Sequence, residues 1–328
     1  MFYVVATIEC LAVSFLVGVL TSVLCLPASR LVWTRTRQRH PGTTANILFA
    51  SRLIPPVIGA LVALEFALPA YLLFEPRPSD DYIGPMQLGF AAFGALILTV
   101  MVFRGAHILR STYLVEKRWK SLSTRIDVPG IGIPTYCVEG VPSLFVATGM
   151  MRPCVFVSRE IVQEFSADEM AAAAAHEMAH IRAHDNLKQL LLDICRPPVW
   201  LLRLGAADHL WLQSVELAAD QAALAEGNAP LHLASALLKV ARQRKSLLGQ
   251  FRVAGSHLVP AESAVRLETR VNHLVELSDG ETASRSRQFS RRLVYGCILA
   301  SVLCFVLSYV ATAHVVLRFV ERALDVLF

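Results

Sequence analysis

Four long apolar runs constrain this chain more than any other feature of its sequence. Each reaches the roughly 20 residues that a helix needs to cross a bilayer. Charged residues inside the runs are few, among them Glu9, Glu65 and Arg104. The composition agrees, because 55% of the residues are hydrophobic and only 17% are charged, whereas soluble domains carry about a quarter charged residues. The runs cover residues 4–26, 53–74, 86–109 and 293–317.

The charges between these runs predict the orientation of the helices. Lys and Arg gather in the cytoplasmic loops of membrane proteins. Arginines follow the first run at 30–39, Lys117 and Arg118 follow the third, and Arg291 precedes the fourth, while the loop after the second run is acidic on balance. We therefore expect the N-terminus outside and the large central segment in the cytoplasm. The expected parts are residues 1–110 with three transmembrane helices, 111–291 as a cytoplasmic domain, and 292–328 with a fourth helix and a short outer tail.

The central segment divides into a strand-rich part and a helical part. Short β-branched and aromatic runs separated by Gly and Pro predict the strands. Ser166 and Glu169 have the spacing of a capping box, and the helix that they begin should run to about Cys195. A second helix is expected over 208–226. The expected strands are 133–138, 143–147 and 153–157.

One histidine pair in the first of these helices indicates a metal site. His176 and His180 are four residues apart, so both imidazoles project from one helix face and reach one Zn²⁺. Glu177 lies one position round, where a general base belongs. Glu216 and Asp220 share a face of the second helix, where Glu216 would be the third ligand and Asp220 would hold a ligand histidine. The alternative for these two acids is a solvated helix face.

Other residues near the motif have less certain roles. Three histidines stacked on one straight helix do not converge on one ion, so we expect His184 beside the site or in solvent. Asp185 is expected either near the site or paired with an arginine such as Arg182. The apolar stretch 186–204 and Trp211 either touch the membrane surface or pack in the domain core. Candidates to stabilise the oxyanion or contact substrate are Arg270, His257, His209 and His273.

Residues 142–220 resemble the BlaR/MecR antirepressor family of integral-membrane zinc metallopeptidases. The related HtpX and CAAX-processing membrane proteases share the two metal motifs. The resemblance implies a mainly α fold: four transmembrane helices, with a cytoplasmic α+β gluzincin-type zinc metallopeptidase domain inserted between helices three and four. It also implies one Zn²⁺ per chain on His176, His180 and Glu216, with Glu177 as general base. The residues that carry it are Pro142, Gly149, Pro153, Val155–Ser158, His176, Glu177, His180, Ile181, Asp185, Glu216 and Asp220.

The expected function is endopeptidase activity at the inner membrane of a bacterium, in regulatory proteolysis such as cleavage of a transcriptional repressor. An HtpX-like quality-control protease is the nearest alternative. A non-catalytic receptor or scaffold with a structural zinc is another, although three ligands favour catalysis because structural sites take four. Expected partners are a protein or peptide substrate, the lipid bilayer and a second copy of the chain.

Three further features narrow these expectations of function and partners. The family's β-lactam sensors carry an outer penicillin-binding domain after the fourth helix, whereas this chain ends soon after Leu317; we therefore expect activation by a partner or by the membrane helices. No basic-aromatic pattern indicates nucleic acid. The seven cysteines form no C-x-x-C pair, which argues against a disulfide framework or a cysteine metal site.

Overall fold

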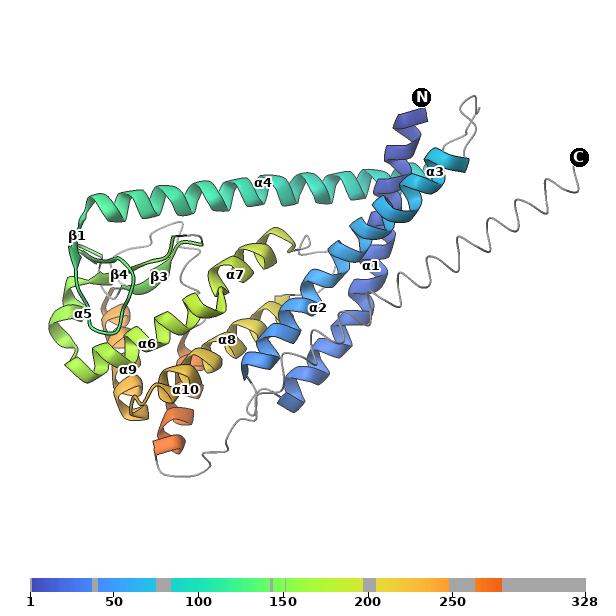
Figure 1. Cartoon of the computed structure of the whole chain (residues 1–328). Coiled ribbons are helices and arrows are strands. Elements are labelled where there is room, and N and C mark those ends of the chain that lie inside the picture. The colour runs from blue at the N-terminus through green and yellow to red at the C-terminus, as the bar shows by residue number, and fades with distance from the viewer. Residues whose placement is uncertain are drawn as a thin grey trace, which may run out of the picture. The chain divides into compact units, whose positions relative to one another are not determined.

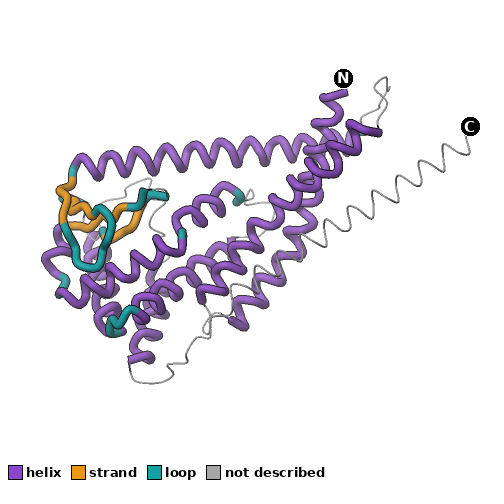
Figure 2. The backbone as a smooth tube through the Cα atoms, viewed as in Figure 1, coloured by secondary structure: helices purple, strands orange, loops and turns teal. Residues whose placement is uncertain are grey.

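The computed structural model is mostly helical, with one small sheet (Figures 1 and 2). The expected fourth membrane helix at 293–317 and the candidate His257 lie outside the residues that it describes. The insertion of the domain between helices three and four therefore stays a prediction. The structure describes residues 2–36, 41–74, 84–141, 144–150, 152–196, 205–247 and 263–278.

Three helical stretches are long and apolar enough to cross a membrane, and the chain is a membrane protein. The first is α1 (Phe2–Thr36). The second comprises α2 (Pro41–Val62), a π-helical turn at Ala63–Ala67 and α3 (Leu68–Phe74). The third is α4 (Pro85–Ser121).

The second stretch begins earlier than its apolar run predicts. Residues 41–52 were expected as loop, yet α2 includes them. Two of their polar side chains, Thr44 and Arg52, are buried. Arg52 donates from Nε to Asp208 Oδ1 of a later helix at 2.8 Å. Tertiary packing therefore extends this helix beyond the part that hydropathy reveals.

Close backbone contacts join α1 to its two neighbours. A Cβ on Gly59 of α2 would lie 2.5 Å from the carbonyl oxygen of Ser14, and a Cβ on Gly94 of α4 would lie 2.5 Å from that of Leu11. Neither position tolerates a larger side chain without movement of a backbone. Small residues at such crossings are how helices pack tightly in lipid, where no hydrophobic effect drives them together.

The sheet has the strand order β1-β2-β4-β3. Strands β2 and β4 are parallel, and the outer pairs β1–β2 and β3–β4 are antiparallel. All five residues of β4 are buried, as befits a central strand. The three expected strands are confirmed, and β1 was missed because its short, half-exposed sequence carries little pattern. The bounds are β1 Ser123–Ile126, β2 Thr135–Val138, β3 Phe145–Thr148 and β4 Cys154–Ser158.

The remaining helices follow the sheet in the sequence. The Ser166–Glu169 capping box is confirmed, with each side chain bonded to the other residue's backbone N–H. The expectation of one helix to Cys195 is wrong, because the chain turns at His184 (φ 57°) and two helices result. The bounds are α5 Arg159–Glu164, α6 Ala167–Ala183, α7 Asp185–Ile194, α8 Gly205–Ala225, α9 Pro230–Leu247 and α10 Ser263–Ser278.

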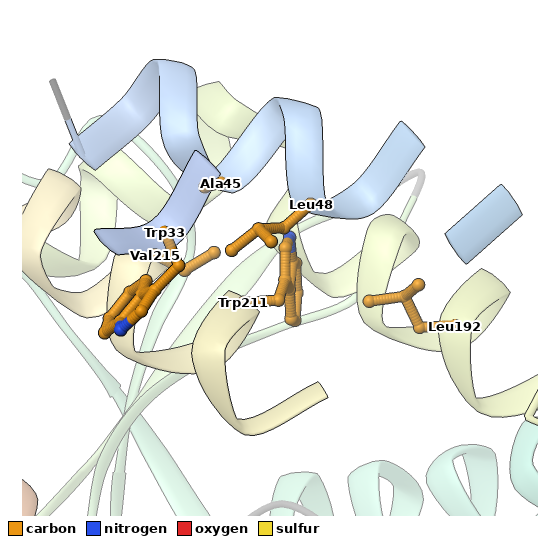
Figure 3. Packing of buried hydrophobic residues seen from close by; sticks show 6 residues of the cluster. All are labelled: Trp33, Ala45, Leu48, Leu192, Trp211 and Val215. Carbon is orange, nitrogen blue, oxygen red and sulfur yellow. The ribbon is translucent and has the colours of Figure 1, made fainter. Parts of the chain in front are cut away.

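A buried apolar cluster joins the first two membrane helices to α7 and α8 (Figure 3). Leu48 from α2 and Trp211 from α8 are almost completely buried in it. Leu192 of α7 belongs to the same cluster. Of the two expectations for this stretch, the described residues therefore follow packing in a core, and part of that core comes from the membrane helices. The cluster contains Trp33, Ala45, Leu48, Leu192, Trp211 and Val215.

Candidate metal centre and active site

Small side chains let α6 and α8 pack closely enough for their polar residues to meet. Ala172 and Ala175 of α6 share a buried cluster with Ala223 of α8, Leu233 of α9 and Leu274 of α10. Alanine adds little bulk between packed helices, whose separation depends on the side chains at the contact. The histidines of α6 and the carboxylates of α8 face each other beside this cluster.

His176, His180 and Glu216 form a group whose candidate ligand atoms all lie within 4.8 Å of one another. The two Nε2 atoms are 3.1 Å apart. Glu216 lies 3.6 Å from Nε2 of His176 through Oε2 and 4.0 Å from Nε2 of His180 through Oε1. Ligands about 2.0–2.1 Å from a tetrahedral zinc are separated by about 3.3 Å. The three residues therefore fit one Zn²⁺.

Each histidine is backed by a carboxylate on its other ring nitrogen. Nδ1 of His176 lies 3.0 Å from Oδ1 of Asp220, and Nδ1 of His180 lies 2.9 Å from Oδ2 of Asp185. A proton on Nδ1 leaves the Nε2 lone pair for a metal. The hydrogen bond with Asp185 selects this tautomer of His180, and the nearby carboxylate of Asp220 favours it electrostatically in His176. Asp220 thus lies beside His176, and Asp185 lies beside His180 rather than beside Arg182, whose ion pair is with Glu226.

Arg270 of α10 binds both carboxylates of α8. Its Nε and Nη2 donate to Asp220 at 2.8 and 2.6 Å, and its Nη1 donates to Oε2 of Glu216 at 2.6 Å. Burial alone would raise the pKa of Glu216 and Asp220, but the guanidinium holds both pKa values below their usual range. Both groups are thus kept as carboxylates. In this arrangement the guanidinium of Arg270 donates its hydrogen bonds to Glu216 and Asp220.

The same carboxylates affect His176. Burial alone would lower the pKa of its imidazole, but the hydrogen bonds with Asp220 and Glu216 raise that pKa to about 9. Without a metal, the buried negative charge therefore attracts a proton to this ring. A divalent cation would satisfy the same charge.

Glu177 is held by the edge strand of the sheet. Its Oε2 accepts a hydrogen bond from the backbone N–H of Ala147 in β3 at 2.8 Å. Ala147 is buried between the sheet and α6, in a cluster with Val155 and Ala174. The bond fixes one carboxylate oxygen of Glu177.

The other candidate histidines lie apart from this group within the part of the chain that the structure describes. His184 is exposed and ends α6 in the left-handed conformation, with Nδ1 3.0 Å from the carbonyl oxygen of Ile181. His209 is on α8 and His273 on α10, and neither belongs to the metal-binding group.

Asn186 was not predicted. Its side-chain amide donates to the backbone oxygen of Ala147 at 3.1 Å. Its position directly after Asp185 is the one signal in the sequence. The end of α6 at His184 decides where its side chain lies, and the sequence did not predict that end.

Known proteins match this part of the chain. The family described as BlaR1 peptidase M56 matches residues 89–274, more than half of the 328 residues. The chain belongs to this family. The resemblance drawn from the two metal motifs is thereby confirmed, and the matched stretch contains all of the residues that form the candidate site.

Two curated relatives are HtpX proteases. Protease HtpX of Xylella fastidiosa is 32% identical over 114 residues, which cover 32% of this chain and 39% of the relative. The Protease HtpX homolog of Albidiferax ferrireducens is 28% identical over 121 residues, which cover 32% of this chain and 41% of the relative. The chain thus spans about two fifths of the length of the curated relatives that it matches.

Proposed function

We propose that this M56-family chain is a membrane-embedded, zinc-dependent endopeptidase. The observation that carries the proposal is the group of His176, His180 and Glu216, with ligand atoms within 4.8 Å, beside a glutamate that a backbone N–H holds in place. Three protein ligands leave room for water, as in catalytic zinc sites. A closed structural site, the alternative for a receptor or scaffold, would need a fourth ligand.

The residues divide the work of peptide hydrolysis. Zn²⁺, when bound, supplies Lewis acidity that makes water nucleophilic near neutral pH and polarises a carbonyl group. Glu177 takes the proton from the attacking water and passes it to the leaving amine, so that the C–N bond breaks with its proton count balanced. Asp185 and Asp220 keep the ligand histidines oriented throughout.

The edge strand β3 is the proposed place for the substrate backbone, at outward positions other than Ala147, whose N–H and carbonyl bind Glu177 and Asn186. It is the outermost strand on its side of the sheet, and it runs past Glu177 through Ala147. An extended peptide that adds to a sheet edge is bound mainly through its backbone. Such binding accepts peptides of many sequences, and the side chains around the site would then set the preference for particular substrate residues.

Glu177→Gln tests the chemistry. We expect this variant to keep a full equivalent of zinc and to lose cleavage of fluorescein-labelled casein by at least about a hundredfold, the contribution of a general base. Zinc content is measured on the same samples. Retained cleavage would contradict the assigned base, and a zinc-free wild-type protein would contradict the metal site.

Two biological roles are proposed as candidates. Membership of the BlaR1 peptidase M56 family favours regulatory proteolysis, such as cleavage of a transcriptional repressor. The likeness to HtpX proteases favours quality control of other proteins. Trapping substrates in cells with the Glu177→Gln variant discriminates them, since a single DNA-binding protein indicates the first role and a mixture of misfolded clients the second.

The catalytic domain is proposed to lie on the cytoplasmic side of a bacterial inner membrane. Lys117, Arg118 and Lys120 follow the apolar part of α4, where the positive-inside rule places the cytoplasmic side. A cysteine introduced at the exposed Arg182 should resist a membrane-impermeant maleimide in spheroplasts and react in inverted vesicles. The opposite pattern would reverse the topology.

A further inference from the structure

Asn186 connects the metal-binding helices to the edge strand. It lies in the first turn of α7, directly after Asp185. Asp185 points to His180, whereas the Asn186 amide donates to Ala147 of β3 at 3.1 Å. The left-handed turn at His184 makes this possible, because it redirects the chain so that consecutive side chains reach the metal ligand and the strand.

Both polar groups of Ala147 point away from the sheet. In an antiparallel pair, residues alternate between bonding the neighbouring strand and facing outward. Leu144 accepts from Ser158 at the end of β4, so that Leu144 and Val146 face β4 while Ala147 faces outward. The outward N–H of Ala147 binds Glu177 and its outward carbonyl binds Asn186. One residue of the edge strand is thus held on both sides by residues of the site.

We infer that Asn186 is a positioning residue that sets the edge strand β3 relative to the base Glu177. This inference rests on the proposed peptidase function. Asn186 fixes the carbonyl of the residue whose N–H fixes the base, so a loss of its amide donor releases the strand end that orients Glu177. Displacement of reacting groups by about 1 Å costs on the order of a hundredfold in rate, whereas the metal ligands, which Asn186 does not touch, should keep their geometry.

Three variants of the full chain test this role. Asn186→Asp replaces the donor by a carboxylate that repels the Ala147 carbonyl, and Asn186→Gln retains an amide donor. Asn228→Asp is the matched control, because Asn228 also donates an amide hydrogen bond to a backbone oxygen, that of Ala223 at 2.8 Å, at the far end of α8. Cleavage of fluorescein-labelled casein gives kcat and KM, and the absorption spectrum of the Co²⁺-substituted protein reports the metal ligands.

We expect kcat/KM to fall about tenfold to a hundredfold in Asn186→Asp, with partial recovery in Asn186→Gln and wild-type activity in Asn228→Asp. The Co²⁺ spectrum should be unchanged in all three. Wild-type cleavage by Asn186→Asp, no recovery in Asn186→Gln, or a spectrum altered as much as the activity would overturn the role of Asn186 while leaving the peptidase function standing. If the zinc-loaded wild-type protein itself cleaved nothing, the proposed function would fall, and the inference with it.

Discussion

Each of the two histidines proposed to bind zinc has an acid from another helix beside its Nδ1 atom. Asp220 reaches His176 from α8, and Asp185 reaches His180 from the start of α7. The two acids differ in their other ion pairs. Asp220 is also bound by Arg270, whereas Asp185 has, among the described residues, only Lys188 at 3.5 Å. Asp185 is therefore the cleaner residue with which to test how orientation of a ligand affects metal affinity.

Asp185→Asn should weaken zinc binding about 10- to 100-fold, the usual cost of losing a carboxylate behind a ligand histidine. The amide no longer enforces the tautomer that leaves Nε2 free, and it removes a negative charge near the cation. Competition with a chromophoric chelator measures the affinity. The exposed Asp127 provides the matched control, since Asp127→Asn should bind zinc as the wild type does. Equal affinities in both variants would contradict the role of Asp185.

At the scale of residues, the sequence best predicts the relative positions of side chains on a single helix. The relation of His176, Glu177 and His180 follows from spacing along a single helix. Glu216 needed the packing of two helices, which spacing along one helix does not give. The contacts of Arg270 and Asn186 were not predictable, because they depend on how α10 and the strand β3 approach α8 and α7.

At the scale of elements, the break between α6 and α7 shapes the site. Where a helix ends in a residue of left-handed conformation, that residue is usually glycine, because glycine has no Cβ to clash with the backbone. Here His184 takes that conformation with φ 57°. Histidine gives no sequence signal for such an end, which is why one continuous helix was expected. The strands β2, β3 and β4 were predictable because short apolar runs between Gly and Pro are distinctive.

His184→Gly should stabilise the protein by about 0.5–1 kcal/mol, because a left-handed residue with a Cβ costs roughly 1–2 kcal/mol. Part of the gain is offset by glycine's greater freedom in the unfolded chain and by the lost contact of the His184 ring with the oxygen of Ile181. The midpoint of chemical unfolding in detergent measures the change. His184→Val should destabilise, since a β-branched residue tolerates this conformation least. A destabilised glycine variant would show that the ring contact matters more than the backbone.

The start of α6 is tied to α9 through Glu169, which gives stability a pH dependence. Burial alone would raise the pKa of this carboxyl, but hydrogen bonds from Lys239, Ser235 and the backbone of Ser166 lower it from 4.5 to about 2. A lowered pKa in the folded state stabilises fully above pH 4.5, and that contribution is lost as the pH falls toward 2.

Acidification from pH 5 to pH 2 should therefore cost up to about 3 kcal/mol through Glu169. Glu169→Gln should be less stable at pH 7 and should lose this part of the pH dependence. Unfolding free energies at both pH values measure it. The exposed Glu160 serves as control, because Glu160→Gln should follow the wild-type profile. If the unfolding free energy of Glu169→Gln fell with pH as steeply as that of the wild type, Glu169 would not be the source of the acid sensitivity.

At the scale of the described molecule, the membrane helices and the helices of the metal site share a core. Trp33 and Leu48 from α1 and α2 pack with Trp211 and Val215 of α8 (Figure 3). Val215 directly precedes Glu216. The ion pair of the buried Arg52 and the partly buried Asp208 joins the same two parts at 2.8 Å. The position of a proposed zinc ligand thus depends on α2, a link that hydropathy alone does not reveal because it treats the two parts separately.

A fragment of residues 111–278 should therefore not fold by itself. It would expose Leu192, Trp211 and Val215, which the membrane helices cover in the whole chain, and loss of such burial costs about 3–5 kcal/mol for a single large aromatic residue. We expect the purified fragment to bind a hydrophobic dye, to unfold without a cooperative transition and to take up less than one equivalent of zinc. Co-expression with residues 1–110 as a separate chain should restore cooperative unfolding and zinc binding. Cooperative unfolding of the fragment alone, with a full equivalent of zinc, would show that the shared core is dispensable for the metal site.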